Sequence, residues 1–70
     1  MKLTKKEAIE IVASIEKIKG DDETAHSKED SLREWFIECC ANGFYTKKEM
    51  IEIGLIVLNT KDIDFARWCA

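Results

Sequence analysis

The sequence has no proline and only three glycines among its 70 residues. Sheet proteins rely on these two residue types at their tight turns, so their scarcity favours helices joined by short connections. No apolar run is long enough to cross a bilayer, and the opening stretch MKLTKKEAIE lacks the apolar block of a signal peptide. We therefore expect a cytoplasmic protein with no membrane partner.

Concentrated positive charge is also missing. The net charge is −3, and each of the densest basic pairs, Lys5-Lys6 and Lys47-Lys48, has a glutamate beside it. A nucleic-acid surface needs a basic face, so a nucleic-acid partner is not expected. The three cysteines, with Cys39 and Cys40 adjacent, form no disulfide framework, and we expect them to act as small apolar residues.

Two nearly identical octapeptides are present, TKKEAIEI from Thr4 and TKKEMIEI from Thr46. A threonine followed three residues later by a glutamate is the capping box that begins a helix. The apolar spacing after the first predicts a helix over residues 5–19, ended by a left-handed Gly20. After the second, apolar residues surround the helix axis as far as residues 59–60. Such a helix is either central in the core or covered by a partner.

The stretch after the first helix is GDDETAHSKED at residues 20–30, and its first part, residues 20–27, has no apolar period and is predicted to be a loop. Ser27 and Asp30 resemble a third capping box, which predicts a second helix from Lys28 to Ala41. Gly43 is the natural left-handed residue after it.

The last ten residues, KDIDFARWCA, are too apolar to lie free in solvent. We expect them to dock on the helices, either extended or as a short fourth helix. The predicted fold is therefore all-α: one domain over residues 1–70, built as a compact three-helix bundle with a docked C-terminal segment. A chain of this length has a stability margin of only about 3–5 kcal/mol.

The only histidine, His26, lies close in sequence to Glu29 and Asp30. Carboxylates with one imidazole suit Mg²⁺ or Mn²⁺, so a small metal-dependent enzyme, or a subunit of one, is an alternative function. The structural alternative is an acidic helix start stabilised by the helix dipole. The sequence offers no complete catalytic constellation, and we expect neither enzymatic activity nor a cofactor.

The second and third helices, joined by ANGFYT, also suggest a helix-turn-helix DNA-binding module as a second alternative. A recognition helix presents polar and basic side chains to the groove, whereas the third helix carries MIEIGLIVL after its first turn.

Two stretches, GDDETAHSKEDSL at 20–32 and VLNTKDIDFARWCA at 57–70, carry a resemblance. They are similar to a group of small uncharacterised proteins, many from bacteriophages and prophages, that share an acidic AHSxED segment and a C-terminal IDFARWC motif. The group has no established activity, so no catalytic residue carries over. The resemblance implies a phage-type accessory protein that acts in the cytoplasm of a bacterial host.

The matching residues define a candidate interaction surface, which consists of His26, Glu29, Asp30, Asp64, Phe65, Arg67 and Trp68. A purely structural explanation is that the tail packs beside the start of the second helix. Arg67 would then pair with Glu29 or Asp30, and Trp68 would cover His26. The functional explanation is that both segments frame one binding surface. We expect a non-enzymatic interaction protein that binds a protein partner, and a homodimer is one form that this contact can take.

Overall fold

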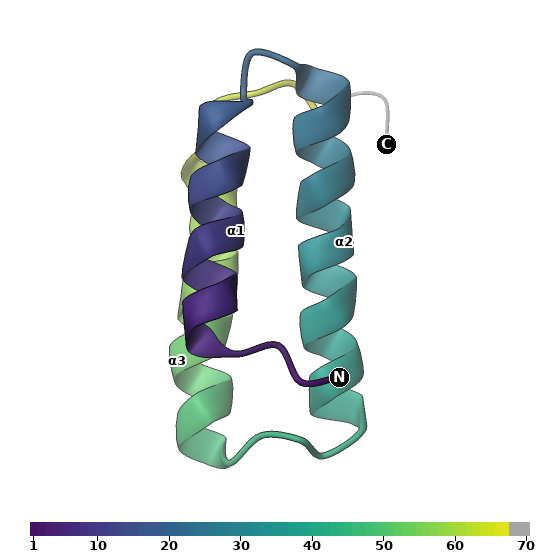
Figure 1. The fold of residues 1–70 in the computed structure, drawn as a ribbon, viewed down its shortest axis with the longest axis vertical. Coiled ribbons are helices and arrows are strands. Elements are labelled where there is room, and N and C mark those ends of the chain that lie inside the picture. The colour runs from purple at the N-terminus through teal and green to yellow at the C-terminus, as the bar shows by residue number, and fades with distance from the viewer. Residues whose placement is uncertain (68–70) are drawn as a thin grey trace.

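The computed structural model describes residues 1–67, and its helices are α1 (Lys5–Lys17), α2 (Asp22–Ala41) and α3 (Lys47–Leu58). A 3₁₀ helix, η1 (Asn59–Asp62), continues directly from α3. Figure 1 shows the three α-helices side by side along the long axis, with each antiparallel to the one before it in the chain. Residues 1–67 contain no strand. The predicted all-α three-helix bundle is therefore confirmed.

The two octapeptides begin α1 and α3 with the same hydrogen bonds. The Glu7 N–H donates to Thr4 Oγ1 at 3.2 Å, and the Thr4 N–H donates to Glu7 Oε1 at 3.1 Å. In α3 the corresponding distances between Thr46 and Glu49 are 3.1 and 3.0 Å. Both predicted capping boxes are confirmed, because each needs only residues within one helical turn.

The predicted end of α1 at residue 19, followed by a left-handed Gly20, is wrong in both respects. The helix ends at Lys17 with Ile18 as its cap, and Gly20 does not adopt the left-handed conformation. Gly43, after α2, does adopt it, with φ at 70°. The Ile18 N–H instead donates to the Ser14 and Ile15 carbonyls, so the last turn of α1 closes without a glycine.

The predicted start of α2 is wrong by six residues, because the helix begins at Asp22 and not at Lys28. Asp21 is the cap: its Oδ1 accepts from the Thr24 N–H at 3.3 Å and its Oδ2 accepts from the Thr24 hydroxyl at 2.9 Å. Residues 22–27 of the predicted loop are therefore helical, only residues 20 and 21 of it lie outside a helix, and Ser27 lies inside α2 and does not begin it. The apolar period was hidden because two polar residues, His26 and Glu29, occupy buried positions in these first turns.

The core lies along the bundle axis and includes Ala8 and Ile15 of α1, Leu32 of α2, and Ile53 and Val57 of α3. Aromatic rings lie at its margins. The rings of Phe36 and Tyr45 stack with their centroids 5.8 Å apart, and Phe65 is buried at the other end of the molecule.

Terminal segments cross both ends of the bundle (Figure 1). Residues 1–3 reach the C-terminal end of α2, where Leu3 is fully buried and its carbonyl accepts from the Tyr45 hydroxyl at 2.6 Å. Residues 63–67 cross from η1 to the start of α2, where the Ala66 N–H donates to Asp22 Oδ1 at 3.2 Å. Ile63 and Phe65 are buried, so residues 61–67 of the predicted tail dock as expected.

Candidate functional site

The most buried charged group among residues 1–67 is the Glu29 carboxylate, on the second turn of α2. Glu29 is only 2% exposed, and Arg67 from the C-terminal segment forms a bidentate ion pair with its carboxylate. Arg67 Nε donates to Glu29 Oε1 at 2.8 Å, and Arg67 Nη2 donates to Oε2 at 3.0 Å. Arg33, one turn further along α2, adds a second positive charge 3.6 Å from Oε2.

Arg67 also donates hydrogen bonds to backbone carbonyls of η1 and of its own C-terminal segment. Its Nη2 donates to the carbonyls of Thr60 at 2.7 Å and Ile63 at 3.2 Å, and its Nη1 donates to the Phe65 carbonyl at 3.2 Å. The guanidinium also lies 3.8 Å from the centre of the Phe65 ring, within range of a cation–π contact. One side chain therefore connects α2, η1 and the tail.

These neighbouring groups determine the pKa of Glu29. Burial alone raises the pKa of a carboxyl group, but the hydrogen bonds from Arg67 and the positive charge of Arg33 outweigh it and lower the pKa of Glu29. The same contacts raise the pKa of Arg67 above its ordinary value, chiefly through the hydrogen bonds to Glu29. The pair is thus ionised over the whole neutral range.

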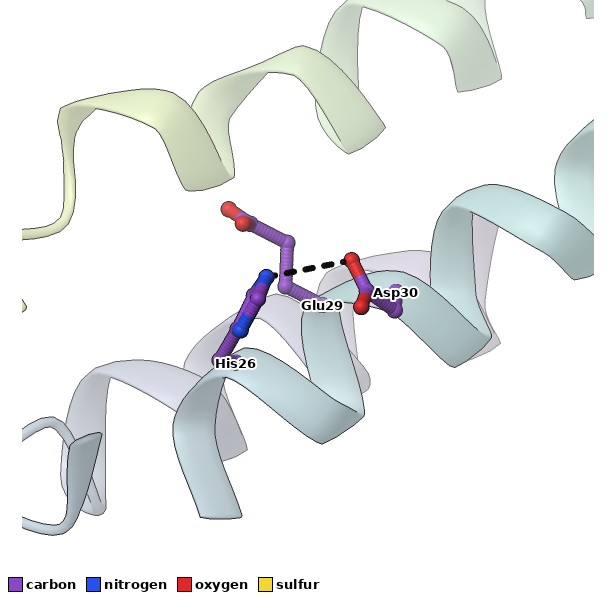
Figure 2. Close-up of side chains that lie close together, drawn as sticks. All are labelled: His26, Glu29 and Asp30. Atoms are coloured by element: carbon purple, nitrogen blue, oxygen red, sulfur yellow. Dashed lines mark ion pairs between the residues drawn. The ribbon is translucent and has the colours of Figure 1, made fainter. Parts of the chain in front are cut away.

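His26 and Asp30 lie beside this ion pair on the same face of α2 (Figure 2). The His26 Nε2 atom is 3.5 Å from Asp30 Oδ1, across one helical turn, and Asp30 is exposed. Ligand atoms of His26, Glu29 and Asp30 all lie within 4.8 Å of one another, a spacing that a metal ion can bridge. Figure 2 shows the Glu29 carboxylate pointing away from Asp30, toward the side where Arg67 holds it. A metal ion that used all three ligands would compete with Arg67 for the Glu29 carboxylate.

The structure brings together the sequence-predicted residues in three contacts: Glu29 with Arg67, His26 with Asp30, and Arg67 with Phe65. The predicted packing of the tail beside the start of α2, with Arg67 pairing to Glu29, is confirmed. Glu29 and Phe65 are buried, whereas Asp30 and Asp64 are exposed. Trp68, predicted to cover His26, lies outside the described residues. Arg33 was not among the predicted residues, although its position four residues after Glu29 on a helix was a usable signal.

A second feature lies on the outer side of α3, where large apolar side chains face solvent. Four of them form one surface with Gly54, which we name the α2–α3 apolar face: Ile37 (62% exposed), Ile51 (54%), Leu55 (60%) and Leu58 (50%). On α3 the spacing of four and then three residues places Ile51, Leu55 and Leu58 in one stripe. Ile37 comes from α2, beside Leu58.

A groove of about 160 Å³ runs between the two helices within this face. Its lining residues are Arg33, Phe36, Ile37, Gly54, Val57 and Leu58. Gly54 leaves the groove open: a Cβ atom there would lie 3.2 Å from Cζ of Phe36, whose ring packs beneath it. The sequence indicated that α3 is apolar on all sides, but only the bundle decides which side is covered.

The arrangement of α2 and α3 offers no support for a helix-turn-helix. Figure 1 shows them antiparallel along the long axis, whereas the two helices of that motif cross nearly at right angles. The outward side of α3 past its first turn is the apolar stripe, which carries no donors for base edges.

No known protein family, curated protein or solved structure matches this chain. Within residues 1–67, no helix combines the length and apolar character needed to cross a membrane.

Proposed function

We propose that this chain is a non-enzymatic interaction protein that binds protein through the α2–α3 apolar face. The observation that carries the proposal is the exposure of four large aliphatic side chains, three in one stripe of α3 and one on α2, two of which line a groove between these helices. Apolar surface gathered in this way on a small domain is typical of a protein-binding site. The stripe at four- and three-residue spacing is also the pattern by which helices are recognised in grooves.

The resemblance to phage and prophage proteins supports the proposal that this binding takes place inside a bacterial host. A phage accessory protein of this kind acts in the bacterial cytoplasm by occupying a host or viral protein. Tyr45 and Phe65 are buried, so these rings are not available for such a contact, whereas the aliphatic stripe is exposed.

A photo-crosslinking amino acid at position 55 tests the proposal in a bacterial host lysate. We expect a heterologous protein to be captured from position 55 and released from capture by excess unmodified chain. The control places the same amino acid at position 44, because Phe44 is also exposed but lines a different groove with Met1 and Trp35. Capture at both positions equally, or at neither, contradicts the proposal.

A metal-dependent activity is the second candidate, and the proximity of His26, Glu29 and Asp30 within 4.8 Å is the observation in its favour. The competing ion pair with Arg67 weighs against it. Calorimetric titration with Mn²⁺ or Zn²⁺ distinguishes the two. Heat release that disappears in Asp30→Asn supports a site, whereas no heat and no change in melting temperature removes this candidate.

A further inference from the structure

Residues 1–3 cross the C-terminal end of α2 and are held there by side chains of that helix (Figure 1). Trp35 Nε1 donates to the Met1 carbonyl at 2.8 Å, and the Leu3 N–H donates to Cys39 Sγ at 3.4 Å. Neither of these bonds is part of a helix. The segment can therefore leave its place without breaking a backbone hydrogen bond of α1, α2 or α3.

The point about which the segment can turn lies within Leu3. The Leu3 carbonyl and the Thr4 N–H belong to one planar peptide unit. The Tyr45 hydroxyl binds this unit through the carbonyl at 2.6 Å, and the Glu7 carboxylate binds it through the N–H at 3.1 Å. The peptide unit is thus fixed to the bundle, and the chain before it can rotate while the capping box of α1 stays intact.

The segment lies directly over the thiol of Cys39. The Leu3 side chain is 0% exposed, and Cys39 is 1% exposed. The Cys39 Sγ atom also lies 3.8 Å from the Met1 carbonyl oxygen. A groove of about 210 Å³ beside this contact has Met1 and Cys39 in its wall, so only residues 1–3 separate this side of the thiol from solvent.

The attachment of the segment is weak compared with the core. Met1 is 96% exposed, and the ion pair between Lys2 and Glu49 at 2.7 Å lies at the surface, where such pairs contribute little. Leu3 is the only fully buried side chain of the three. A segment with so few buried contacts opens locally at a lower free-energy cost than global unfolding.

We infer that residues 1–3 form a lid over Cys39, and that this lid opens about Leu3 while the three helices stay folded. The opening controls when a reagent in solution reaches the thiol. The lid lies at the end of the bundle away from η1 and outside the α2–α3 apolar face, so the inference is independent of the proposed function.

Thiol labelling of the full chain in urea tests the lid. Cys40→Ala and Cys69→Ala leave Cys39 as the single thiol, and circular dichroism verifies the fold. N-ethylmaleimide is the probe: the sulfur adds to one carbon of its double bond, and a proton goes to the neighbouring carbon. Should this variant not fold, fragment-ion mass spectrometry of the labelled wild type distinguishes Cys39 from Cys40.

Below the unfolding transition, we expect a slow labelling rate that hardly changes with urea, because local opening exposes little surface. A rate that climbs from the start with the urea dependence of global unfolding overturns the lid, since the thiol then reacts only in the unfolded chain. A rate in the absence of urea equal to that of the unfolded chain also overturns it, because the thiol is then not covered.

A matched pair of variants locates the opening. Leu3→Val and Ile63→Val each remove one methylene group from a buried side chain, at opposite ends of the bundle. Leu3→Val should raise the labelling rate at low urea by about two- to tenfold, because it weakens the anchor of the lid. Ile63→Val should leave this rate unchanged and lower only the midpoint of global unfolding. Equal acceleration in both variants overturns the inference.

Discussion

At the scale of single residues, the main polar feature of residues 1–67 is the buried ion pair between Glu29 and Arg67. A carboxylate that is 2% exposed is stable as an ion only because Arg67 donates two hydrogen bonds to it and Arg33 lies near. The pair lies 38 residues apart in sequence. Its contribution is therefore to the tertiary fold, since it attaches the tail to α2.

Arg67→Ala should destabilise the protein by about 2–4 kcal/mol, because the Glu29 carboxylate stays buried after its partner is removed. This is a large share of the margin of about 3–5 kcal/mol expected for a domain this small. Urea unfolding followed by circular dichroism measures the change. Lys61→Ala, at an exposed residue without such a partner role, is the control and should change stability by less than about 0.5 kcal/mol. Similar values for both variants would show that the ion pair contributes little.

The lowered pKa of Glu29 predicts a loss of stability in acid. An unfolded glutamate has a pKa near 4.3, and the folded value is below it, so the native state binds fewer protons in this range. The stabilisation is complete above the unfolded pKa and is lost as the pH falls through the folded pKa. Unfolding curves measured from neutral pH down to about pH 3 should show this decline. Glu29→Gln should show a smaller decline, and an identical pH profile would argue against Glu29 as its source.

At the scale of elements, the helix starts differ in how they are determined. Thr4 and Thr46 begin their helices through hydrogen bonds to Glu7 and Glu49, within the same turn. The start of α2 instead combines a local cap at Asp21 with a buried polar group, Glu29, whose partner Arg67 comes from the C-terminal segment. This difference explains why α1 and α3 were predicted to begin at the correct residue and α2 was not.

A pair of substitutions tests the corrected start of α2. Asp21→Ala should cost about 1 kcal/mol, because the Thr24 N–H and hydroxyl lose their acceptor. Ser27→Ala, at the cap predicted from sequence alone, should change stability by less than about 0.5 kcal/mol because Ser27 is an exposed residue inside the helix. Thermal unfolding of both variants gives the comparison. A larger loss in Ser27→Ala would restore the original prediction.

At the scale of the whole molecule, a thin core is closed at both ends by chain segments. Residues 1–3 cross one end, where Leu3 is fully buried, and residues 63–67 cross the other, where Ile63 and Phe65 are buried. This closure leaves the outer side of α3 apolar and exposed. The tail contributes to stability, and under the proposed function the α2–α3 apolar face is the separate surface that binds a partner.

Truncation after Thr60 tests this division. We expect the shortened chain to lose cooperative unfolding at room temperature, because it loses the buried Ile63 and Phe65 and leaves Glu29 without Arg67. Glu29→Leu in the shortened chain should recover part of the helicity, since it removes the uncompensated buried charge. A shortened chain that melts at the temperature of the full chain would mean that the tail has no structural role.

The all-α fold class, two capping boxes, the left-handed Gly43 and the docking of the tail could be predicted from the amino-acid sequence. These features depend on hydrogen bonds within one turn, or on apolar side chains that must be removed from water. The start of α2 at Asp22, the burial of Glu29 with Arg67 and the solvent-facing side of α3 depend on long-range packing and were not predicted. The physical reason is the same in each case: a buried polar group, or an exposed apolar one, is settled by what packs against it, and that neighbour is distant in the sequence.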